Sequence, residues 1–358
     1  MKLAETPSRL GGHSNAFGFL RLLFASLVIF SHVPEIVDKN ANRELLYRIT
    51  GEMTFGRFAV WGFFVISGYL ITGSLLASSS KYSYLIKRVA RIYPAFIVAS
   101  FVCIVLVVPL SGGTWTSGLP AALAAGGARM AILARPMAEG VFPGQSFNDY
   151  ATGLNGAMWT IQYEFLCYLM VLALMVVGAF RKPISVPFLS FALIAVGTFC
   201  VGVLPAGLAR RSLFPGGPEQ LFLLTGIFLA GSSFYLYRAK VHFDRRIILL
   251  ASAGLIAFMF NVYTAPIGYA VFGTYLIFAA AKAGAGTWIG KINDKNDISY
   301  GVYLYAWPAE QLLIRNIGTD SLLLLVVLTW AIAAVLGWLS WIFVERPVAE
   351  FMRNRRSR

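Results

Sequence analysis

The first long apolar run of the sequence, near residues 16–33, contains two ionisable side chains, Arg21 and His32. Eleven positions separate them, which brings them to within about 20° of the same helical face but about 16.5 Å apart along the axis. Both can therefore line one inward-facing stripe without touching. Ionisable groups inside apolar helices are candidates for function. The alternatives are an Arg21 that extends to the membrane surface and a His32 that is a hydrogen-bonded interfacial side chain.

Glu164 and Arg57 are the next candidates, because each lies near the start of an apolar run. Counting helical positions from these starts puts both side chains near the depth of His32, close to the outer surface. A carboxylate there would fix the tautomer of the imidazole and compensate buried charge. A purely structural pair of Glu164 with Arg57 is the alternative.

A basic cluster follows the second apolar run and consists of Lys87, Arg88 and Arg91. Arg88 and Arg91 are three residues apart and share one face if the segment is helical. Guanidinium groups in this arrangement can bind phosphates bidentately. A cluster that only sets membrane topology is the competing interpretation.

The pair Ser67-Gly68 occurs in the second apolar run and is typical of helices that approach each other closely. Packing is favoured over a nucleophilic Ser67, because the G-x-S-x-G context of serine hydrolases is missing around it. Further side chains suited to a pocket wall, or to an aromatic belt in the case of the tyrosines, are Trp159, Thr160, Tyr300 and Tyr303.

The elements that position these side chains must be membrane helices. Of the 358 residues, 58% are hydrophobic and only 13% are charged, about half the charged share of soluble domains. Such a chain cannot cover a globule with polar surface, which excludes a soluble protein. The net charge is +14, but the basic residues are dispersed between apolar runs, so no nucleic-acid partner is expected.

Ten apolar runs approach the length needed to span a bilayer, and they predict an all-α, polytopic membrane protein with about ten transmembrane helices. The Ala- and Gly-rich stretch 118–135 is predicted to be re-entrant or interfacial, and an eleventh span is the alternative. No internal repeat is visible, so residues 1–358 are predicted to form a single transmembrane domain with short polar tails at 1–15 and 345–358. The predicted spans lie near 16–33, 55–78, 94–110, 159–179, 185–204, 219–236, 247–263, 265–281, 298–316 and 321–344.

The distribution of Lys and Arg predicts the orientation of the bundle. With the N-terminus inside, 20 of these residues fall in cytoplasmic segments and 8 in outer loops, as expected when the more basic loops face the cytoplasm. Both termini and the 81–93 segment are therefore predicted to be cytoplasmic, and residues 111–158 external. The three cysteines lie in apolar runs without ligand spacing, so neither a disulfide framework nor a metal site is predicted.

Taken together, these motifs resemble those of the acyltransferase-3 family, the bacterial membrane O-acyltransferases that include O-antigen, exopolysaccharide and nodulation-factor acetyltransferases. Their order and spacing across residues 17–347 carry the resemblance. One departure is Ala306, where many members have His. The matching motifs are Arg21-x10-His32, Phe63–Leu70 with Ser67-Gly68, Arg88-x2-Arg91-Ile-x-Pro94, Trp159-Thr160-x3-Glu164, Phe228-x2-Gly231-x3-Tyr235, Ser299-Tyr300-x2-Tyr303-Leu304 and Val344-Glu345-x-Pro347.

The resemblance implies a multi-pass enzyme of the bacterial cytoplasmic (inner) membrane. It would move an acyl group, often acetyl, from cytoplasmic acyl-CoA to a hydroxyl of a cell-surface or lipid-linked glycan. Acyl-CoA is then a donor substrate, and no permanently bound cofactor is expected. A polytopic transporter or lipid-linked glycan flippase without acyl transfer is the alternative.

Within this interpretation, His32 deprotonates the acceptor hydroxyl or carries the acyl group covalently, with Glu164 orienting it. Arg21 stabilises charge on the donor or on the thioester oxygen. The nucleotide phosphates of acyl-CoA would be held by Lys87, Arg88 and Arg91. The substrate pocket is expected to include Arg57, Ser67, Trp159, Thr160, Tyr300 and Tyr303.

Overall fold

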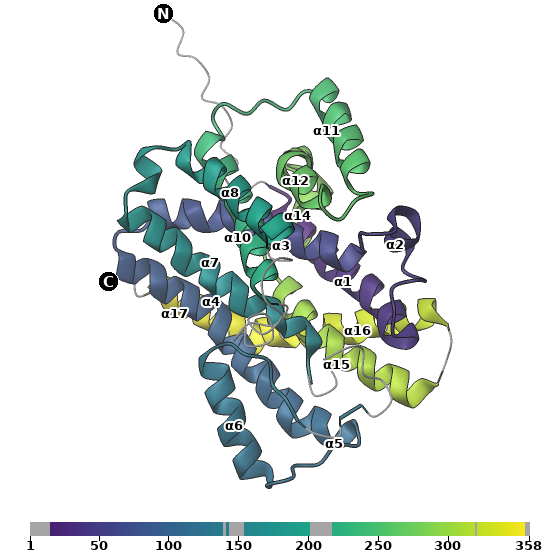
Figure 1. The fold of residues 1–358 in the computed structure, drawn as a ribbon. Coiled ribbons are helices and arrows are strands. Elements are labelled where there is room, and N and C mark those ends of the chain that lie inside the picture. The colour runs from purple at the N-terminus through teal and green to yellow at the C-terminus, as the bar shows by residue number, and fades with distance from the viewer. Residues whose placement is uncertain (1–14, 139–140, 143–153, 201–216, 319–320, 355–358) are drawn as a thin grey trace, which may run out of the picture.

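The computed structural model describes residues 15–138, 141–142, 154–200, 217–318 and 321–354, and the elements in these ranges are all helices (Figure 1). Seven helical segments in the described part are long and apolar enough to cross a membrane. They are α1 (Phe17–Asp38), α3 (Phe55–Leu76), α4 with α5 (Lys81–Val102, Val108–Leu110), α7 (Trp159–Val176), α10 (Gly217–Tyr237), α12 with α13 (Ala265–Gly268, Thr274–Ala283), and α16 with α17 (Leu322–Ser340, Arg346–Asn354). The composite helices are joined by single π-helical turns, at Cys103–Val107, Tyr269–Gly273 and Trp341–Glu345.

The three other predicted spans are also helical but do not meet the same length and composition. The first two, α8 (Ser185–Ala195) and α11 (Arg245–Phe258), are short, and α15 (Ser299–Ile317) has the length but is more polar. The all-α, multi-pass architecture is thus confirmed, whereas the count of ten spans stays a prediction. The 118–135 stretch contains α6 (Leu119–Ala131), a helix of 13 residues that is too short to span a bilayer.

Two glycines allow α3 and α10 to touch through their backbones near the centre of the bundle. A Cβ on Gly68 would lie 1.9 Å from the carbonyl oxygen of Phe228, and one on Gly231 would lie 2.0 Å from that of Val65. Neither distance is possible for a real side chain, so both positions require glycine. This contact agrees with the close helix approach predicted at Gly68 and fixes the spacing of α3 and α10.

The short loop before α15 is fastened to the start of α1. Asn293 lies in the left-handed backbone region, with φ of 58°, and its side-chain amide donates to the carbonyl of Gly18 at 2.9 Å and to Asp297 at 3.0 Å. The backbone N–H of Ile298 donates to the side chain of Asn293 at 2.8 Å. These bonds place Asp297 beside the first turns of α1.

The polypeptide that precedes α7 is buried in the bundle before α7 begins, and it ends in a short 3-10 turn at Gly156–Met158. Residues 154–158 are all buried, and the Asn155 amide donates to the carbonyl of Leu304 at 2.6 Å while its side-chain oxygen accepts from the N–H of Ala157. The helix therefore begins inside the molecule rather than at its outer surface. A count of helical positions that starts at the outer surface therefore does not apply to α7.

Candidate active site

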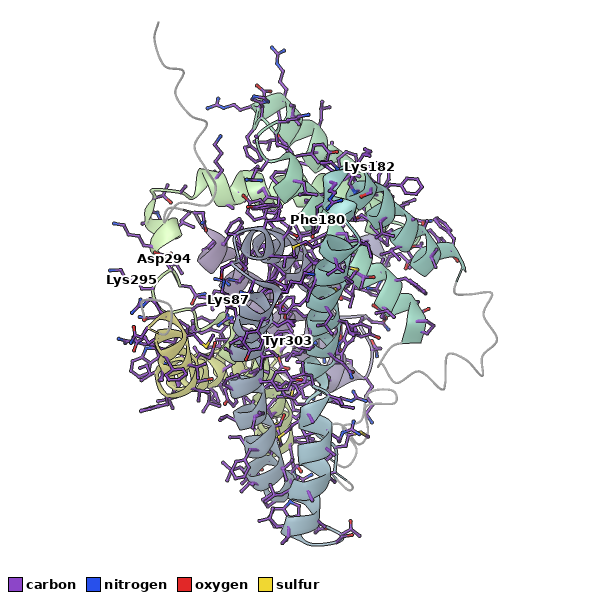
Figure 2. All side chains as sticks on the ribbon, turned by 90° about the vertical axis from the view of Figure 1, so that its left-hand side faces the viewer. Lys87, Phe180, Lys182, Asp294, Lys295 and Tyr303 are labelled. Atoms are coloured by element: carbon purple, nitrogen blue, oxygen red, sulfur yellow. The ribbon has the colours of Figure 1, made fainter. Side chains whose placement is uncertain are left out.

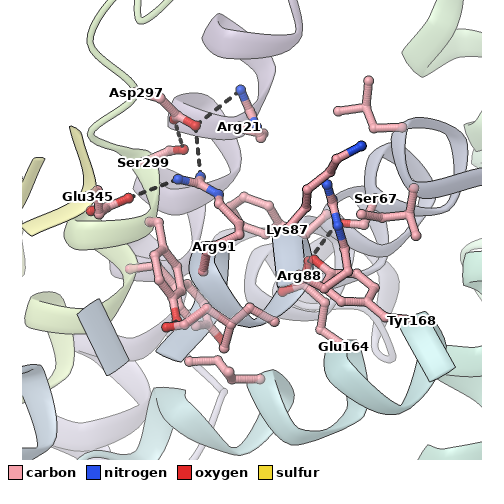
Figure 3. A pocket seen from close by; sticks show the side chains of 18 of the residues that line it. Arg21, Ser67, Lys87, Arg88, Arg91, Glu164, Tyr168, Asp297, Ser299 and Glu345 are labelled. Atoms are coloured by element: carbon pink, nitrogen blue, oxygen red, sulfur yellow. Dashed lines mark hydrogen bonds and ion pairs between the residues drawn. The ribbon is translucent and has the colours of Figure 1, made fainter. Parts of the chain in front are cut away.

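A cavity of about 430 Å³ opens between α1, α3, α4, α7, α15 and the C-terminal helical segment (Figure 3). Figure 2 shows Lys87 and Tyr303 near the middle of the molecule, and Asp294 and Lys295 at its edge. We call this space the inner cavity, because Lys87, Arg88 and Arg91 belong to the 81–93 segment, which is predicted to be cytoplasmic. The site residues predicted from sequence that line it are Arg21, Ser67, Lys87, Arg88, Arg91, Thr160, Glu164, Tyr300 and Tyr303.

Two of the arginines in the inner cavity are neutralised by carboxylates (Figure 3). Asp297 accepts from Arg91 at 2.9 Å and pairs with Arg21 at 3.2 Å, and Arg91 also bonds Glu345 at 2.9 Å. Burial by itself would raise the pKa of Asp297, but the two guanidinium groups and the bond from Ser299 lower it to about 2. Asp297 therefore remains a carboxylate at physiological pH, and Arg91 has little capacity left for a second anion.

The other two cations of the inner cavity have no carboxylate partner within hydrogen-bonding or ion-pairing distance in the described part of the chain. Lys87 donates to the hydroxyl of Ser78 at 3.0 Å, and Arg88 to that of Ser74 at 3.3 Å. The guanidinium of Arg88 also lies 5.8 Å from the ring centroid of Tyr168. A half-buried cation that is bonded only to neutral groups favours an anionic ligand, so Lys87 and Arg88 are the better phosphate candidates.

Glu164 lies in the inner cavity, where it accepts hydrogen bonds from Ser67 at 2.8 Å and Tyr168 at 2.6 Å. The prediction that it orients His32 is wrong, and so is its alternative pairing with Arg57, which donates to the carbonyl of Glu52 at 3.1 Å. The physical reason is the buried segment 154–158 before α7, which places Glu164 in the inner cavity. In Figure 3 it lies among Ser67, Tyr168 and Arg88, apart from the ion pairs of Asp297.

A second cavity of about 340 Å³ contains His32 and the remaining predicted residues, Arg57 and Trp159, together with Glu35 and Trp307. We call it the outer cavity. His32 and Arg57 thus line the same cavity, whereas their shared depth in the membrane stays a prediction. The rings of His32 and Trp307 pack nearly perpendicular to each other, with centroids 4.8 Å apart.

The carboxylate beside His32 comes from α15 and was missed by the sequence analysis. Glu310 is fully buried, and its Oε2 lies 3.7 Å from Nδ1 of His32. The sequence did contain a signal, because Glu310 is a carboxylate within the predicted span 298–316. The interpretation of that span was based instead on the aromatic residues at its start. Asp297 was missed for a different reason, because it precedes the span and belongs to no motif.

The two cavities meet at Tyr303 and Val60, which line both of them. The Tyr303 hydroxyl donates to the carbonyl of Ala157 at 2.7 Å and is hydrogen-bonded to Thr160, also at 2.7 Å. In the described residues no cluster of His, Cys, Asp and Glu could hold a metal ion, and Cys103 and Cys167 are buried free thiols. The arrangement is suited to binding an anion on one side and moving a proton on the other.

Comparison with known proteins gives one family and two relatives. A family model described as an acyltransferase domain matches residues 15–344. An O-acetyl transferase of Shigella phage Sf6 is 27% identical over 338 residues, which cover 93% of this chain and 95% of the phage protein. Nodulation protein 10 of Rhizobium leguminosarum bv. viciae is 35% identical over 108 residues, 30% of this chain and 29% of that protein. No solved structure matches significantly.

Proposed function

The chain belongs to the acyltransferase-3 family and is an O-acyltransferase of the O-acetyltransferase type, and we propose that it moves an acetyl group from cytoplasmic acyl-CoA to a hydroxyl of a cell-surface or lipid-linked glycan. The observation that carries the proposal is the pair of adjoining cavities. One offers cations for a phosphorylated donor, the other offers an imidazole for an acceptor, and Tyr303 lines both.

The inner cavity is the proposed donor site. Coenzyme A carries several phosphate groups, and Lys87 and Arg88 would bind them, since neither is neutralised by a carboxylate. Arg21 is held by Asp297, and its Nε is buried with no hydrogen-bond partner. An unsatisfied guanidinium N–H of this kind is suited to negative charge on the bound donor.

The outer cavity is the proposed acceptor site. Trp159 and Trp307 offer apolar ring surfaces, and Glu35 and Arg57 offer polar groups, the combination that a sugar ring with apolar faces and a hydroxyl rim requires. His32 would take the proton of the acceptor hydroxyl there. Direct transfer and an acyl-histidine intermediate both use this imidazole.

The membrane orientation completes the proposal. We propose a protein of the bacterial cytoplasmic (inner) membrane with about ten spans, both termini inside, and a role in polysaccharide biosynthesis. Arg21, Lys87, Asp297 and Glu345 line one cavity, which supports a common cytoplasmic end for the segments that contribute them. Single cysteines introduced in the C-terminal tail should resist impermeant reagents in intact cells, and those introduced within 111–118 should react. Labelling of the tail from outside would overturn this orientation.

The function is tested by turnover of the purified protein in lipid nanodiscs. Acetyl-CoA should be consumed slowly alone and faster with a glycan acceptor, whereas a transporter or flippase would release no free CoA. Mass spectrometry of surface glycans from cells with and without the gene should show the loss of one acetyl increment per acceptor. Unchanged glycans together with no thiol release would contradict the proposal.

A further inference from the structure

We propose that Glu310 is the positioning residue for the catalytic His32, holding the imidazole as the tautomer protonated at Nδ1 so that Nε2 is the base that faces the acceptor. This inference rests on the proposed function, in which His32 accepts the hydroxyl proton. It assigns to α15 the carboxylate that the sequence analysis expected from Glu164.

The contacts of Glu310 point to one partner. Its side chain has no exposed surface, and neither carboxylate oxygen has a hydrogen-bond partner within the described part of the chain. The nearest ionisable nitrogen is Nδ1 of His32 at 3.7 Å, and that nitrogen is likewise buried without a hydrogen bond. Leaving both groups unsatisfied is costly, and a proton shared between them would satisfy both at once.

The orientation of the His32 ring follows from the same facts. The side chain is 17% exposed and lines the outer cavity, yet Nδ1 is buried. The accessible ring nitrogen is therefore Nε2. The separation of 3.7 Å is slightly longer than a hydrogen bond, and contacts of this kind commonly tighten when substrate binds.

Packing fixes the two helices that carry the pair. The cluster of buried side chains Ala25, Ile29, Val33, Val302 and Ala306 joins α1 to α15, and residues of α16 close it on the third side. The Trp307 ring meets the imidazole edge-on. His32 and Glu310 thus have little freedom to move apart.

Among the residues that the structure describes, Glu310 is the charged side chain paired with Nδ1 of His32. The further titratable and charged side chains of the outer cavity are Glu35, Tyr47, Glu52, Arg57 and Tyr303. Glu35 accepts from the Ser31 hydroxyl at 3.0 Å, and α16 contributes no titratable side chain between Leu322 and Ser340. Glu310 is the one of these carboxylates paired with the imidazole.

Each proton in the proposed transfer step has a donor and an acceptor. The acceptor hydroxyl gives its proton to Nε2 as its oxygen attacks the thioester carbonyl, and the imidazolium donates Nδ1–H to the Glu310 carboxylate. The C–S bond breaks, and the proton on Nε2 passes to the thiolate sulfur, releasing CoA as the thiol. Glu310 keeps its charge throughout and lowers the energy of the imidazolium.

The first test compares Glu310→Gln with Glu350→Gln, the same change at an exposed carboxylate that pairs with Arg346. Glu310→Gln should lower kcat for transfer by roughly 10²-fold with unchanged acetyl-CoA affinity, and should move the acidic limb of the rate profile to lower pH because the imidazolium loses its counter-charge. Glu350→Gln should behave as wild type. Retained acetyl-CoA binding shows that the Glu310→Gln protein is folded.

A second test needs no activity. The chain has three histidines, so replacing His13 and His242 leaves His32 as the sole ¹⁵N-imidazole signal in nanodiscs. Wild-type protein should show Nδ1 protonated and Nε2 free, and Glu310→Gln should lose this preference. An Nε2-protonated ring, or full activity of Glu310→Gln while His32→Ala is inactive, overturns the inference alone. A fully active His32→Ala protein overturns the proposed function instead.

Discussion

The inner and outer cavities treat buried charge in opposite ways. The inner cavity holds four cations. Arg21 and Arg91 form ion pairs with the carboxylates of Asp297 and Glu345. Lys87 and Arg88 instead donate hydrogen bonds to serine hydroxyls. In the outer cavity, the imidazole of His32 lies beside one fully buried carboxylate, that of Glu310. The inner arrangement suits the binding of a highly charged molecule, and the outer one suits the movement of a proton. The comparison divides the reaction into a binding half and a chemical half.

The sharpest way to break this division is His32→Ala. A neutral imidazole accepts a hydroxyl proton near pH 7, which a guanidinium cannot do, and general-base catalysis contributes about 10²–10⁴-fold. Single-turnover acetyl transfer should therefore lose at least about 3 kcal/mol of transition-state stabilisation. Acetyl-CoA affinity should be nearly unchanged, because about 16.5 Å of helix separates His32 from Arg21. Turnover within a few-fold of wild type would make His32 a merely structural side chain.

The complementary change removes the binding half. Lys87→Ala with Arg88→Ala should raise the KM for acetyl-CoA while kcat falls less, since each charge-assisted contact is worth about 1.5–3 kcal/mol. That corresponds to roughly 10–100-fold for each residue. Lys81→Ala is the matched control, because Lys81 is exposed at the start of the same helix and lies outside the inner cavity. Equal KM values for the double variant and the control would return this cluster to a topological role.

Asp297→Asn sharpens the distinction between the two kinds of cation. It removes the charge that holds Arg21 and Arg91, so the protein should lose about 1.5–3 kcal/mol of stability, seen as a lower melting temperature in nanodiscs. The KM for acetyl-CoA should rise less than with Lys87→Ala and Arg88→Ala. If the Asp297→Asn protein melted like wild type and only its KM for acetyl-CoA changed, the ion pairs of Asp297 with Arg21 and Arg91 would serve donor binding rather than stability.

Helical periodicity alone predicted that Arg21 and His32 share one helical face but lie too far apart to touch. Both residues lie on the single helix α1, whose geometry fixes the direction and axial position of each side chain. Periodicity failed for Glu164, since the sequence does not reveal that residues 154–158 are already buried in the bundle before α7 begins. The spans at α8 and α11 stay predictions: α11 ends at Phe258, before the predicted 263, and α8 continues in a π-helical turn at Val196–Cys200, beyond which residues 201–216 lie outside the described part. Glu310 and Asp297 became visible only when α15 and its preceding loop were packed against α1.

The smallest effect is expected for Ser67→Ala, which we compare with a change at its neighbour on α3, Gly68. Ser67→Ala removes one hydrogen bond to Glu164, which keeps the bond from Tyr168, so about 0.5–1.5 kcal/mol is at stake and donor KM should change by at most about tenfold. The adjacent Gly68→Ala should prevent folding instead, since its Cβ would meet the Phe228 carbonyl at 1.9 Å. Acetyl-CoA kinetics and the yield of folded protein measure the two outcomes. A loss with Ser67→Ala as large as that of His32→Ala would make Ser67 a nucleophile and move the chemistry into the inner cavity, so the modest effect predicted here is a direct test of where the acyl group is transferred.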